Sequence, residues 1–589
     1  MEGDGMEVDP HIQPQGDPIH QSEPLPGYSQ IRNEAGGYVF EVSDIDKLKR
    51  FLCLGTELGY YQANSPHRNF SRKEVQAIDR LIQQGRGNEV VKCIKDVSVL
   101  NRACKQNPTL YALAVCARSN DLSTKHAAYS VLNGVCRVPT HLFQFIKYCE
   151  EMSEHETGWG RAHRIAISQW YKQFVEVGPN ARKTPLKLAY LVTKFRCRCK
   201  LRHKDVIRLA HVRSRNKAIR ITLQYALGKT MEVDDSTESI EVKNFLAAVQ
   251  EAKRCIPVND EEKICELIGI HQLSWEHVPN RFLKHSVKVW DSLCRLMPMT
   301  AMIRNLGKMT SLGMHADRPG NEFWVNHVVE KLDDDIQLAR ARIHPLTLLI
   351  AMKHYEQGAN RNKKILWTPN PRIIDALNNA FIRSTKIMQP QGRKYLMAIS
   401  VGEDMRKRIC GSTITAGEAA AAMVYSTIQT EDVEVILFTN RIDDASTATI
   451  KREDNLQNIK EKIFQIPIET RSDYIKQDLS VPFIWAASRK KKFDAIMVFT
   501  DSMTSCGFIH PTEALKQYVQ YMTIPDYRFV VVTMTSNKYS VAAPDSVHNL
   551  DVVGFDTMTP GLIMEFVENS GQSHIVNDDI ILHADEDRF

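Results

Sequence analysis

The stretch KYLMAISVGEDMRKR, residues 394–408, decides how the C-terminal part of the chain folds. Residues 395–399 are an apolar run with the length and composition of a buried strand. The run ends in the polar sequence of residues 400–404, and an alanine-rich segment of helical character follows. A buried strand that leads through a short turn into a helix predicts an α/β domain.

The same alternation continues along residues 390–570. Further strand-like runs lie at Val433–Phe438, Ala495–Thr500 and Phe529–Met534, and helix-like stretches lie at 414–428, 454–465 and 511–522. Strands that alternate with helices predict a mostly parallel, doubly wound sheet. Such folds bind ligands beyond the carboxyl ends of the strands, where the strand order switches.

Residues 37–388 show one helical pattern after another, joined by short polar loops. No strict repeat is visible, but the stretch is long for one ordinary helical core, so we predict an irregular α-solenoid of helical repeats. An ordinary helical domain is the alternative. Residues 1–36 contain five prolines and few large apolar residues, and residues 571–589 are acidic, so we expect a disordered tail at each end.

Composition excludes several classes of protein. The 589 residues contain no apolar run long enough to cross a membrane, and the acidic N-terminus is unlike a secretory signal. The 13 cysteines are scattered and odd in number, which favours reduced thiols in the cytoplasm, or also in the nucleus. We find no nucleotide-binding, metalloprotease or serine-hydrolase motif and therefore predict that the protein is not an enzyme.

Positive charge is concentrated in residues 161–220, which hold 17 Lys/Arg and 2 Asp/Glu, a local balance of +15 in a chain of net charge +6. The rest of the chain is therefore net acidic. A solvated basic face is the common explanation of a charge run. A cluster this one-sided repels itself, however, and favours a polyanionic partner.

Helical spacing singles out particular cations in this cluster. In the segment 184–198, Lys194 and Arg198 are four residues apart, so we expect them on one exposed helix face. In the segment 203–213, Lys204, Arg208 and His211 share a face in the same way. Upstream, Arg161 and Arg164 add to the predicted surface, whereas the nearby tryptophans are more typical of a core. Lysine and arginine neutralise phosphates, and histidine can hydrogen-bond to RNA, so these seven residues are candidate RNA contacts.

Several blocks resemble a known family. The sequences are GYVFEVSDIDKLKRFLCLG, STKHAAYSVLNGVCRVPTHLF, RNLGKMT and ARIHP, with MTSN and GFD near the end. The first four are similar to the TROVE module of the Ro sixty-kilodalton autoantigen family, and the last two to that family's von Willebrand factor A-like domain. The resemblance covers about residues 37–567. It implies a closed ring of HEAT-like helical repeats over 37–388, shut by a von Willebrand factor A-like domain.

The resemblance also implies a function, that of a ribonucleoprotein scaffold in RNA quality control. In this family small noncoding Y RNAs bind the outer surface, and single-stranded 3′ ends of misfolded RNAs enter the ring. The family's Y RNA contacts fall on Lys194, Arg198 and His211, which the residue pattern had already selected. We expect RNA partners, no DNA and no membrane.

One motif departs from the family. The resemblance implies a metal site built from Asp-x-Ser-x-Ser after the first strand, a middle-loop threonine and a later aspartate. Here the first three positions are Ser400, Gly402 and Asp404, and Asp501 alone is plainly kept. A magnesium ion needs oxygen ligands in near-octahedral geometry, so we predict that the site is lost and that no cofactor is bound. A site rebuilt on Asp404 and Asp501 is the alternative.

The altered motif also supports a second hypothesis. The helical ring and a metal-independent A-like domain could form a protein-interaction scaffold, with RNA lost or secondary. Binding through several phosphates weakens steeply with salt, whereas an apolar protein interface does not, so salt dependence separates the two hypotheses.

Overall fold

The fold is described from a computed structural model. It describes residues 18–568, apart from 55–69, 101, 104, 154–157, 177–180, 233–234, 258, 317, 342, 344, 361–362, 386–391, 402, 407–413, 440–444, 449, 465–476, 501–503, 534–537, 545 and 555–558.

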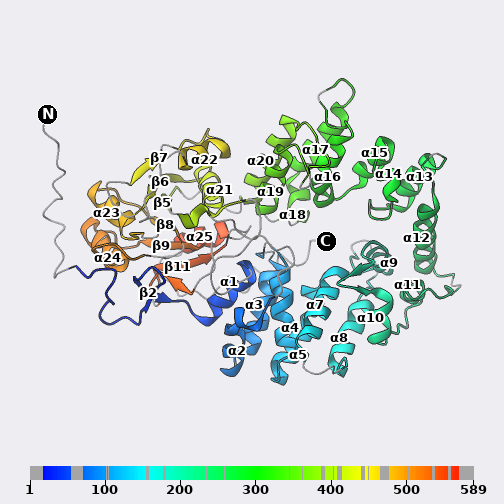
Figure 1. Cartoon of the computed structure of the whole chain (residues 1–589), viewed down its shortest axis with the longest axis horizontal. Coiled ribbons are helices and arrows are strands. Elements are labelled where there is room, and N and C mark those ends of the chain that lie inside the picture. The colour runs from blue at the N-terminus through cyan, green and yellow to red at the C-terminus, as the bar shows by residue number, and fades with distance from the viewer. Residues whose placement is uncertain are drawn as a thin grey trace.

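The first part of the chain is a helical domain in which helices follow one another around a curved path (Figure 1). Its helices are α1 (Asp44–Leu54), α2 (Gln76–Gln83), α3 (Gly87–Val99), α4 (Asn107–Ala117), α5 (Leu122–Ser130), α6 (Leu132–Val135), α7 (Pro139–Glu151), α8 (Arg161–Lys172), α9 (Pro185–Lys194), α10 (His203–Leu209), α11 (Lys217–Leu227), α12 (Thr237–Arg254), α13 (Glu261–His271), α14 (Asn280–Leu283), α15 (Val287–Leu296), α16 (Met299–Ser311), α17 (Glu322–Asp333), α18 (Asp335–Ala341), α19 (Pro345–Glu356) and α20 (Pro371–Thr385), with the short 3₁₀ helix η1 (Arg72–Glu74) before α2.

Local sequence sets the ends of these helices. Thr184 accepts a hydrogen bond from the backbone N–H of Lys187 at the start of α9, and Pro185 occupies the first helical position. Asn216 caps α11 in the same way, and Gly228 ends α11 in the left-handed conformation at φ 70°. Helix α9 then buries one face against its neighbours, as the apolar periodicity predicts, whereas α4 is buried on all sides.

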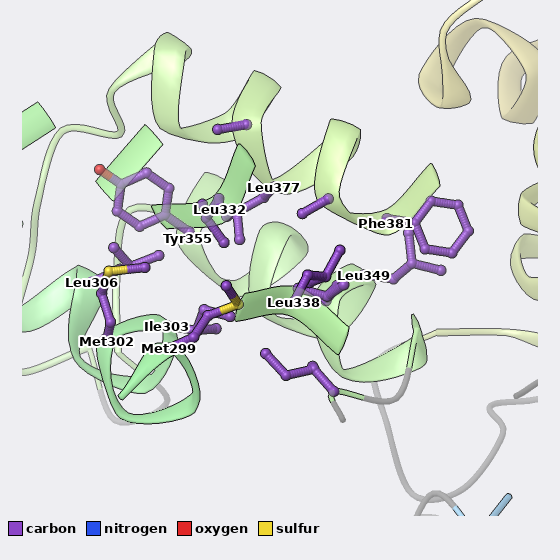
Figure 2. Close-up of a cluster of buried hydrophobic side chains, with 14 of the residues drawn as sticks. Met299, Met302, Ile303, Leu306, Leu332, Leu338, Leu349, Tyr355, Leu377 and Phe381 are labelled. Atoms are coloured by element: carbon purple, nitrogen blue, oxygen red, sulfur yellow. The ribbon is translucent and has the colours of Figure 1, made fainter. Parts of the chain in front are cut away.

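The last helices of this domain show how the packing works. Figure 2 shows apolar side chains from α16 to α20 converging into one cluster, with Met302, Leu306, Leu332, Leu377 and Phe381 among them. All five side chains are at most 1% exposed. Burying a side chain of this size stabilises the fold by about 1.5–3 kcal/mol relative to leaving it in water. The helices are therefore held by a continuous core.

The second part is the predicted α/β domain. Its sheet has the order β11-β9-β8-β5-β6-β7, and every pair is parallel except β6–β7 at one edge. The strands are β5 (Lys394–Ser400), β6 (Asp432–Phe438), β7 (Ser446–Ala448), β8 (Ala495–Thr500), β9 (Arg528–Thr533) and β11 (Asn549–Val553), and the helices are η2 (Glu403–Arg406), α21 (Ala416–Ile428), α22 (Leu456–Phe464), α23 (Val481–Ser488), α24 (Pro511–Met522) and α25 (Thr559–Glu568). The stretch that opened the sequence analysis is thus the central strand.

Alternate side chains of β5 point to opposite faces of the sheet. Tyr395, Met397 and Ile399 join a core with α21, α22 and α25 that continues into the last helices of the helical domain. Leu396 and Ala398 join a separate core with α23 and α24. The sheet is therefore covered by helices on both faces, as a parallel sheet requires.

The two domains close a ring (Figure 1). At one end α20 contacts α21, and Asn378 donates to the Tyr425 hydroxyl (3.2 Å). At the other end α1 contacts β11, where Arg50 pairs with both oxygens of Asp551 at 2.9 and 3.0 Å. The fold class, a helical ring followed by a von Willebrand factor A-like domain, is confirmed.

The N-terminal segment differs from the predicted tail. Residues 18–41, which we call the strap, lie along the α/β domain and contain β1 (Ile31–Arg32) and β2 (Tyr38–Glu41). Strand β2 pairs with both β1 and β10 (Tyr539–Ser540) in a small antiparallel sheet. Polar side chains fix residues 18–36 through hydrogen bonds to the α/β domain, which composition alone does not reveal. Residues 1–17 and the predicted acidic tail at 571–589 lie outside the described residues.

Candidate nucleic-acid interface

A short hairpin lies at the centre of the basic segment. Helix α9 ends at Lys194, and Arg198 belongs to strand β3 (Cys197–Arg198), which pairs with β4 (Leu201–Arg202). The turn residues Cys199 and Lys200 have positive φ angles of 53° and 65°. Two consecutive left-handed residues make a turn whose twist matches that of the paired strands. The prediction that Lys194 and Arg198 share a helix face is therefore wrong.

A buried histidine fastens this hairpin to its surroundings. His203, the first residue of α10, lies 3.0 Å from the Phe195 carbonyl oxygen through Nε2 and 2.8 Å from the Tyr171 hydroxyl of α8 through Nδ1. Burial lowers the pKa of His203 to about 4, so the ring is neutral at neutral pH. A neutral ring can donate from Nε2 to the carbonyl and accept from the tyrosine at Nδ1. The base of the hairpin is thus tied to both α8 and α10.

The other side of the hairpin rests on α7. The Cys199 sulfur lies 3.0 Å from the side-chain oxygen of Gln144, and burial raises the pKa of the Cys199 thiol. Because the thiol stays protonated, it serves as a packing group and weak donor. The turn is therefore supported from both sides, and its cations project from a fixed frame.

Most of the predicted cations are exposed as expected. Arg198 on β3 and Lys204 and Arg208 on α10 are exposed, and none of them forms an ion pair with a carboxylate in the part of the chain that the structure describes. His211 is also exposed, but it follows the end of α10 in the left-handed conformation, at φ 50°. Val206 and Ile207 are buried behind these residues, so α10 has the amphipathic character that the spacing predicts.

Lys194 differs from this group. Its side chain is only 14% exposed, and its Nζ lies 3.4 Å from Oε1 of Glu276 and 3.3 Å from the Tyr190 hydroxyl. The same Nζ lies 5.3 Å from the ring centre of Tyr190 and 5.4 Å from that of Phe195. The expectation of a fully exposed lysine is wrong, because a carboxylate far along the chain folds back onto it.

Arg161 and Arg164 lie at the start of α8, the first exposed and the second half-buried. Tyr171, which contacts α10, is ten residues after Arg161, so the two cations lie about 10–15 Å along the helix from that contact. The neighbouring His163 is buried, and burial lowers its pKa to about 3. Trp170 is fully buried and donates to the Cys136 carbonyl, as a core tryptophan does.

Sequence reasoning missed other cations on the same surface. Lys200 in the turn and Arg202 on β4 are exposed, as are Arg213 and Arg215 just after α10. The described residues hold no ion pair for these four either. Helical periodicity could not select them because they lie in the hairpin and the loops. The high local charge of residues 161–220 was the signal that included them.

The positions of the rewritten metal motif are described only in part. Ser400 ends β5 and is fully buried. Gly402, the side chain of Asp404, the middle loop at 465–476 and Asp501 lie outside the described residues. Among the described residues no three His, Cys, Asp or Glu side chains are grouped as metal ligands would be. A buried serine does not supply the carboxylate that the metal motif requires at this position. Because the other motif positions lie outside the described residues, loss of the site stays a prediction.

Comparisons with known proteins follow the same division of the chain. The TROVE domain model matches residues 31–391, and the Ro60 vWA domain model matches residues 394–567. The chain belongs to the Ro60 family. No helix in the described part is long and apolar enough to span a membrane.

Relatives in this family cover nearly the whole chain. One is the RNA-binding protein RO60 of Caenorhabditis elegans, 32% identical over 91% of this chain and 90% of its own length. Another is the RNA-binding protein RO60 of Deinococcus radiodurans, 30% identical over 91% of this chain and 95% of its own. The crystal structure of the D. radiodurans RO (RSR) protein is similar at a TM-score of 0.63, with 28% identity over 89% of this chain and 99% of that one.

Proposed function

We propose that this protein is an RNA-binding scaffold of a ribonucleoprotein, with its principal RNA surface on the β3–β4 hairpin and α10. The observation that carries the proposal is the set of exposed cations without carboxylate partners among the described residues, Arg198, Lys204 and Arg208 first. A cation already paired with a carboxylate must give up that partner to bind a phosphate. These three residues have no such partner to give up, and they lie on a hairpin and a helix that hydrogen bonds hold in place. The names of the relatives support RNA as the polyanion.

The finer proposal is that this surface binds a small structured noncoding RNA of the Y type, and that the ring takes single-stranded 3′ ends of misfolded RNA. Fixed cations spaced along a hairpin and a helix suit the phosphates of a folded RNA, and His211 adds a group that can hydrogen-bond to a base or a 2′-hydroxyl. The 2′-hydroxyl gives a means of preferring RNA over DNA.

The test replaces Arg198, Lys204 and Arg208 together with alanine in the full chain. Binding to a structured RNA should weaken, and the slope of log affinity against log salt should become shallower by about 2, because up to three phosphate contacts are lost. Folding should be unchanged, since all three side chains are exposed. Fluorescence anisotropy at several salt concentrations measures both quantities, with a duplex DNA of similar length as the comparison.

A matched control removes cations from the α/β domain instead. Arg489 and Lys492 follow α23 and are also exposed. Arg489→Ala with Lys492→Ala should leave RNA affinity and its salt slope close to those of the unchanged protein. The control removes two cations and the test variant three, so equal losses of affinity per cation removed would reject the hairpin surface and indicate only a general effect of net charge.

We propose that the protein binds RNA without a cofactor and without catalysing a reaction. The described cysteines are free, which supports a reducing compartment, and we propose that the protein lies in the cytoplasm, with an additional nuclear pool. If the main interaction of the protein with its cellular partners is insensitive to salt, the protein-interaction scaffold is favoured instead.

A further inference from the structure

The strap inserts a glutamine into the α/β domain. Gln21 is fully buried, and its side-chain nitrogen donates to Oδ1 of Asp478 (2.6 Å) and to the Ile509 carbonyl (2.9 Å). Its side-chain oxygen accepts a hydrogen bond from the Thr504 hydroxyl. Both amide hydrogens and the amide oxygen are therefore used, in three of the four hydrogen bonds that a carboxamide can make.

Backbone contacts hold the same part of the strap. The Gln21 N–H donates to the Gly507 carbonyl (3.1 Å), and the Gln21 carbonyl accepts from the Tyr38 N–H (2.8 Å). Further along, the Asn33 side chain donates to the Thr504 carbonyl (2.8 Å) and accepts from the Gly37 N–H (2.9 Å). The strap thus forms a closed loop whose ends meet at Gln21 and Tyr38.

The site that receives the Gln21 side chain, which we call the slot, is formed by Asp478, Thr504 and Ile509. It lies at the carboxyl ends of the strands. The Asp478 N–H donates to the carbonyl of Thr439, the residue after β6 (3.2 Å). Gln477 forms a parallel bridge with Thr504 and accepts from the hydroxyl of Thr500, the last residue of β8. Because β5 lies between β8 and β6, these partners span the end of β5. In open α/β sheets, ligands bind beyond the carboxyl ends of the strands, at the point where the strand order switches.

Two glycines make the close approach possible. A Cβ atom on Gly507 would overlap the Gln21 amide and the Asp478 carboxylate. A Cβ atom on Gly37 would overlap the Thr504 carbonyl. Contact this close on both sides indicates that the strap and the edge of the α/β domain are fitted to each other.

We propose that the strap is a tethered internal ligand of the α/β domain, with Gln21 as its recognition residue, and that it closes the carboxyl edge to outside ligands. A carboxamide suits the slot because Asp478 and Ile509 offer acceptors and Thr504 offers a donor. A protein ligand of this domain must displace the strap first. Because β2 pairs with β10, and Tyr539 of β10 accepts from Arg50, the strap is also continuous with the ring junction.

The test uses the full chain carrying Gln21→Glu. The change is nearly isosteric, but it sets a carboxylate against Asp478 and removes both amide donors, so the strap should leave its slot. The reactivity of the Cys506 thiol, which is half-buried and next to Gly507, then measures whether the strap has left the slot. We expect iodoacetamide to modify Cys506 several-fold faster in this variant, as located by mass spectrometry. Glu23→Gln, a charge change at an exposed strap residue, is the control and should leave the rate unchanged.

A synthetic peptide of residues 18–37 gives an independent readout. It should bind the Gln21→Glu chain and not the unchanged chain, and the same peptide carrying Gln21→Glu should bind neither. Asn33→Ala, which loses the side-chain hydrogen bonds to the Thr504 carbonyl and from the Gly37 N–H, is a milder second variant that should show intermediate opening. Equal peptide binding by the unchanged chain, or unchanged Cys506 modification in both variants, would overturn the proposal. RNA affinity should not change in any arm, which keeps the outcome separate from the RNA proposal.

Discussion

At the scale of single residues, Lys194 shows how a tertiary contact alters a predicted RNA contact. Glu276 holds the ammonium against Tyr190, and the second oxygen of Glu276, Oε2, is buried without a hydrogen-bond partner among the described atoms. A phosphate that approaches Lys194 must compete with this carboxylate. We therefore expect the pair to lower the affinity of the proposed surface for RNA.

Replacing Glu276 with glutamine tests this competition. Affinity for a structured RNA should rise about two- to fivefold, the range expected for releasing a partly exposed ion pair. The Lys194→Ala background provides the control in a double-mutant cycle, since Glu276→Gln should have little effect there. An equal gain with and without Lys194 would show that Glu276 acts only through long-range charge.

His203 gives a prediction about pH. Its pKa is about 4 in the folded protein and near 6.5 in an unfolded chain. Because the folded pKa lies below the unfolded one, the stabilisation is fully present above pH 6.5 and is lost as the pH falls toward 4. Protonation of His203 should lower the free energy of unfolding by up to about 3 kcal/mol over that range.

Unfolding in urea at pH 7.5, 6 and 5 measures this effect. His203→Gln should flatten the pH dependence, because glutamine keeps a donor for the Phe195 carbonyl and has no charge to gain. His211→Gln is the control, since that ring is exposed. Equal flattening in both variants would contradict the assignment. His141, His163, His277 and His315 also have burial-lowered pKa values, so the helical domain as a whole should be acid-sensitive.

Ser400 leads to a prediction about metal. Millimolar Mg²⁺ or Mn²⁺ should not raise the melting temperature, since only a ligand that prefers the folded state stabilises it. Ser400→Asp, Gly402→Ser and Asp404→Ser together should create such a response. A metal-induced shift in the unchanged protein that Asp501→Ala abolishes would show a rebuilt site instead.

At the scale of elements, the β3–β4 hairpin positions the cations, and its turn depends on two left-handed residues. Cys199→Val places a β-branched side chain at φ 53°, where it is strained, without changing any charge. RNA affinity should fall by about three- to tenfold, equivalent to roughly 1 kcal/mol of lost preorganisation.

Cys197→Val is the matched control for that change. Cys197 lies in the extended strand β3, where valine is favourable. Its affinity for RNA should stay unchanged, and anisotropy titrations at one salt concentration suffice for both variants. Equal effects of the two substitutions would indicate that the hairpin turn does not set the RNA surface.

At the scale of the whole molecule, the ring has two unlike junctions. The α20–α21 junction lies in one apolar core shared by both domains. At the α1–β11 junction Val553 of β11 joins the apolar core of the first helices, and Arg50, which is fully buried, pairs with Asp551 and donates to the Tyr539 carbonyl (2.9 Å). Ser540 donates to Oδ2 of Asp551, one of the two oxygens that Arg50 also contacts. The ring is thus held by apolar packing at both junctions, and a buried ion pair is added at the α1–β11 junction.

Arg50→Ala should therefore loosen one junction only. Removing the arginine leaves Asp551 with the Ser540 hydroxyl but without its cation, and should cost about 3–5 kcal/mol, the usual cost of breaking a buried pair. Lys49→Ala is the control, because Lys49 is 45% exposed in its pair with Asp46 and should cost at most about 1 kcal/mol. Urea unfolding measures the cost, and hydrogen exchange should increase at β10 and β11. Equal costs would show that Arg50 does not fasten the ring.

The sequence alone identified the alternation of strands and helices and the four inner strands of the sheet, because period and composition are local properties, but it did not identify β7, β11, α23 or α25. Apolar runs and their spacing identified β5, β6, β8 and β9, and amphipathic periodicity identified the helices that begin near Pro185 and Lys204. The charge of residues 161–220 located the proposed RNA surface, since a cluster so one-sided is visible without a fold.

Only the tertiary structure decided which polar groups meet across the chain. Glu276 pairs with Lys194, Asp551 with Arg50, and Gln21 fills a slot made by residues more than 450 positions away. These contacts leave no periodic signal, because each depends on one or two side chains brought together by packing elsewhere. The strap is the clearest case: its composition favours disorder, but buried hydrogen bonds and two glycines of exact fit hold it against the sheet edge.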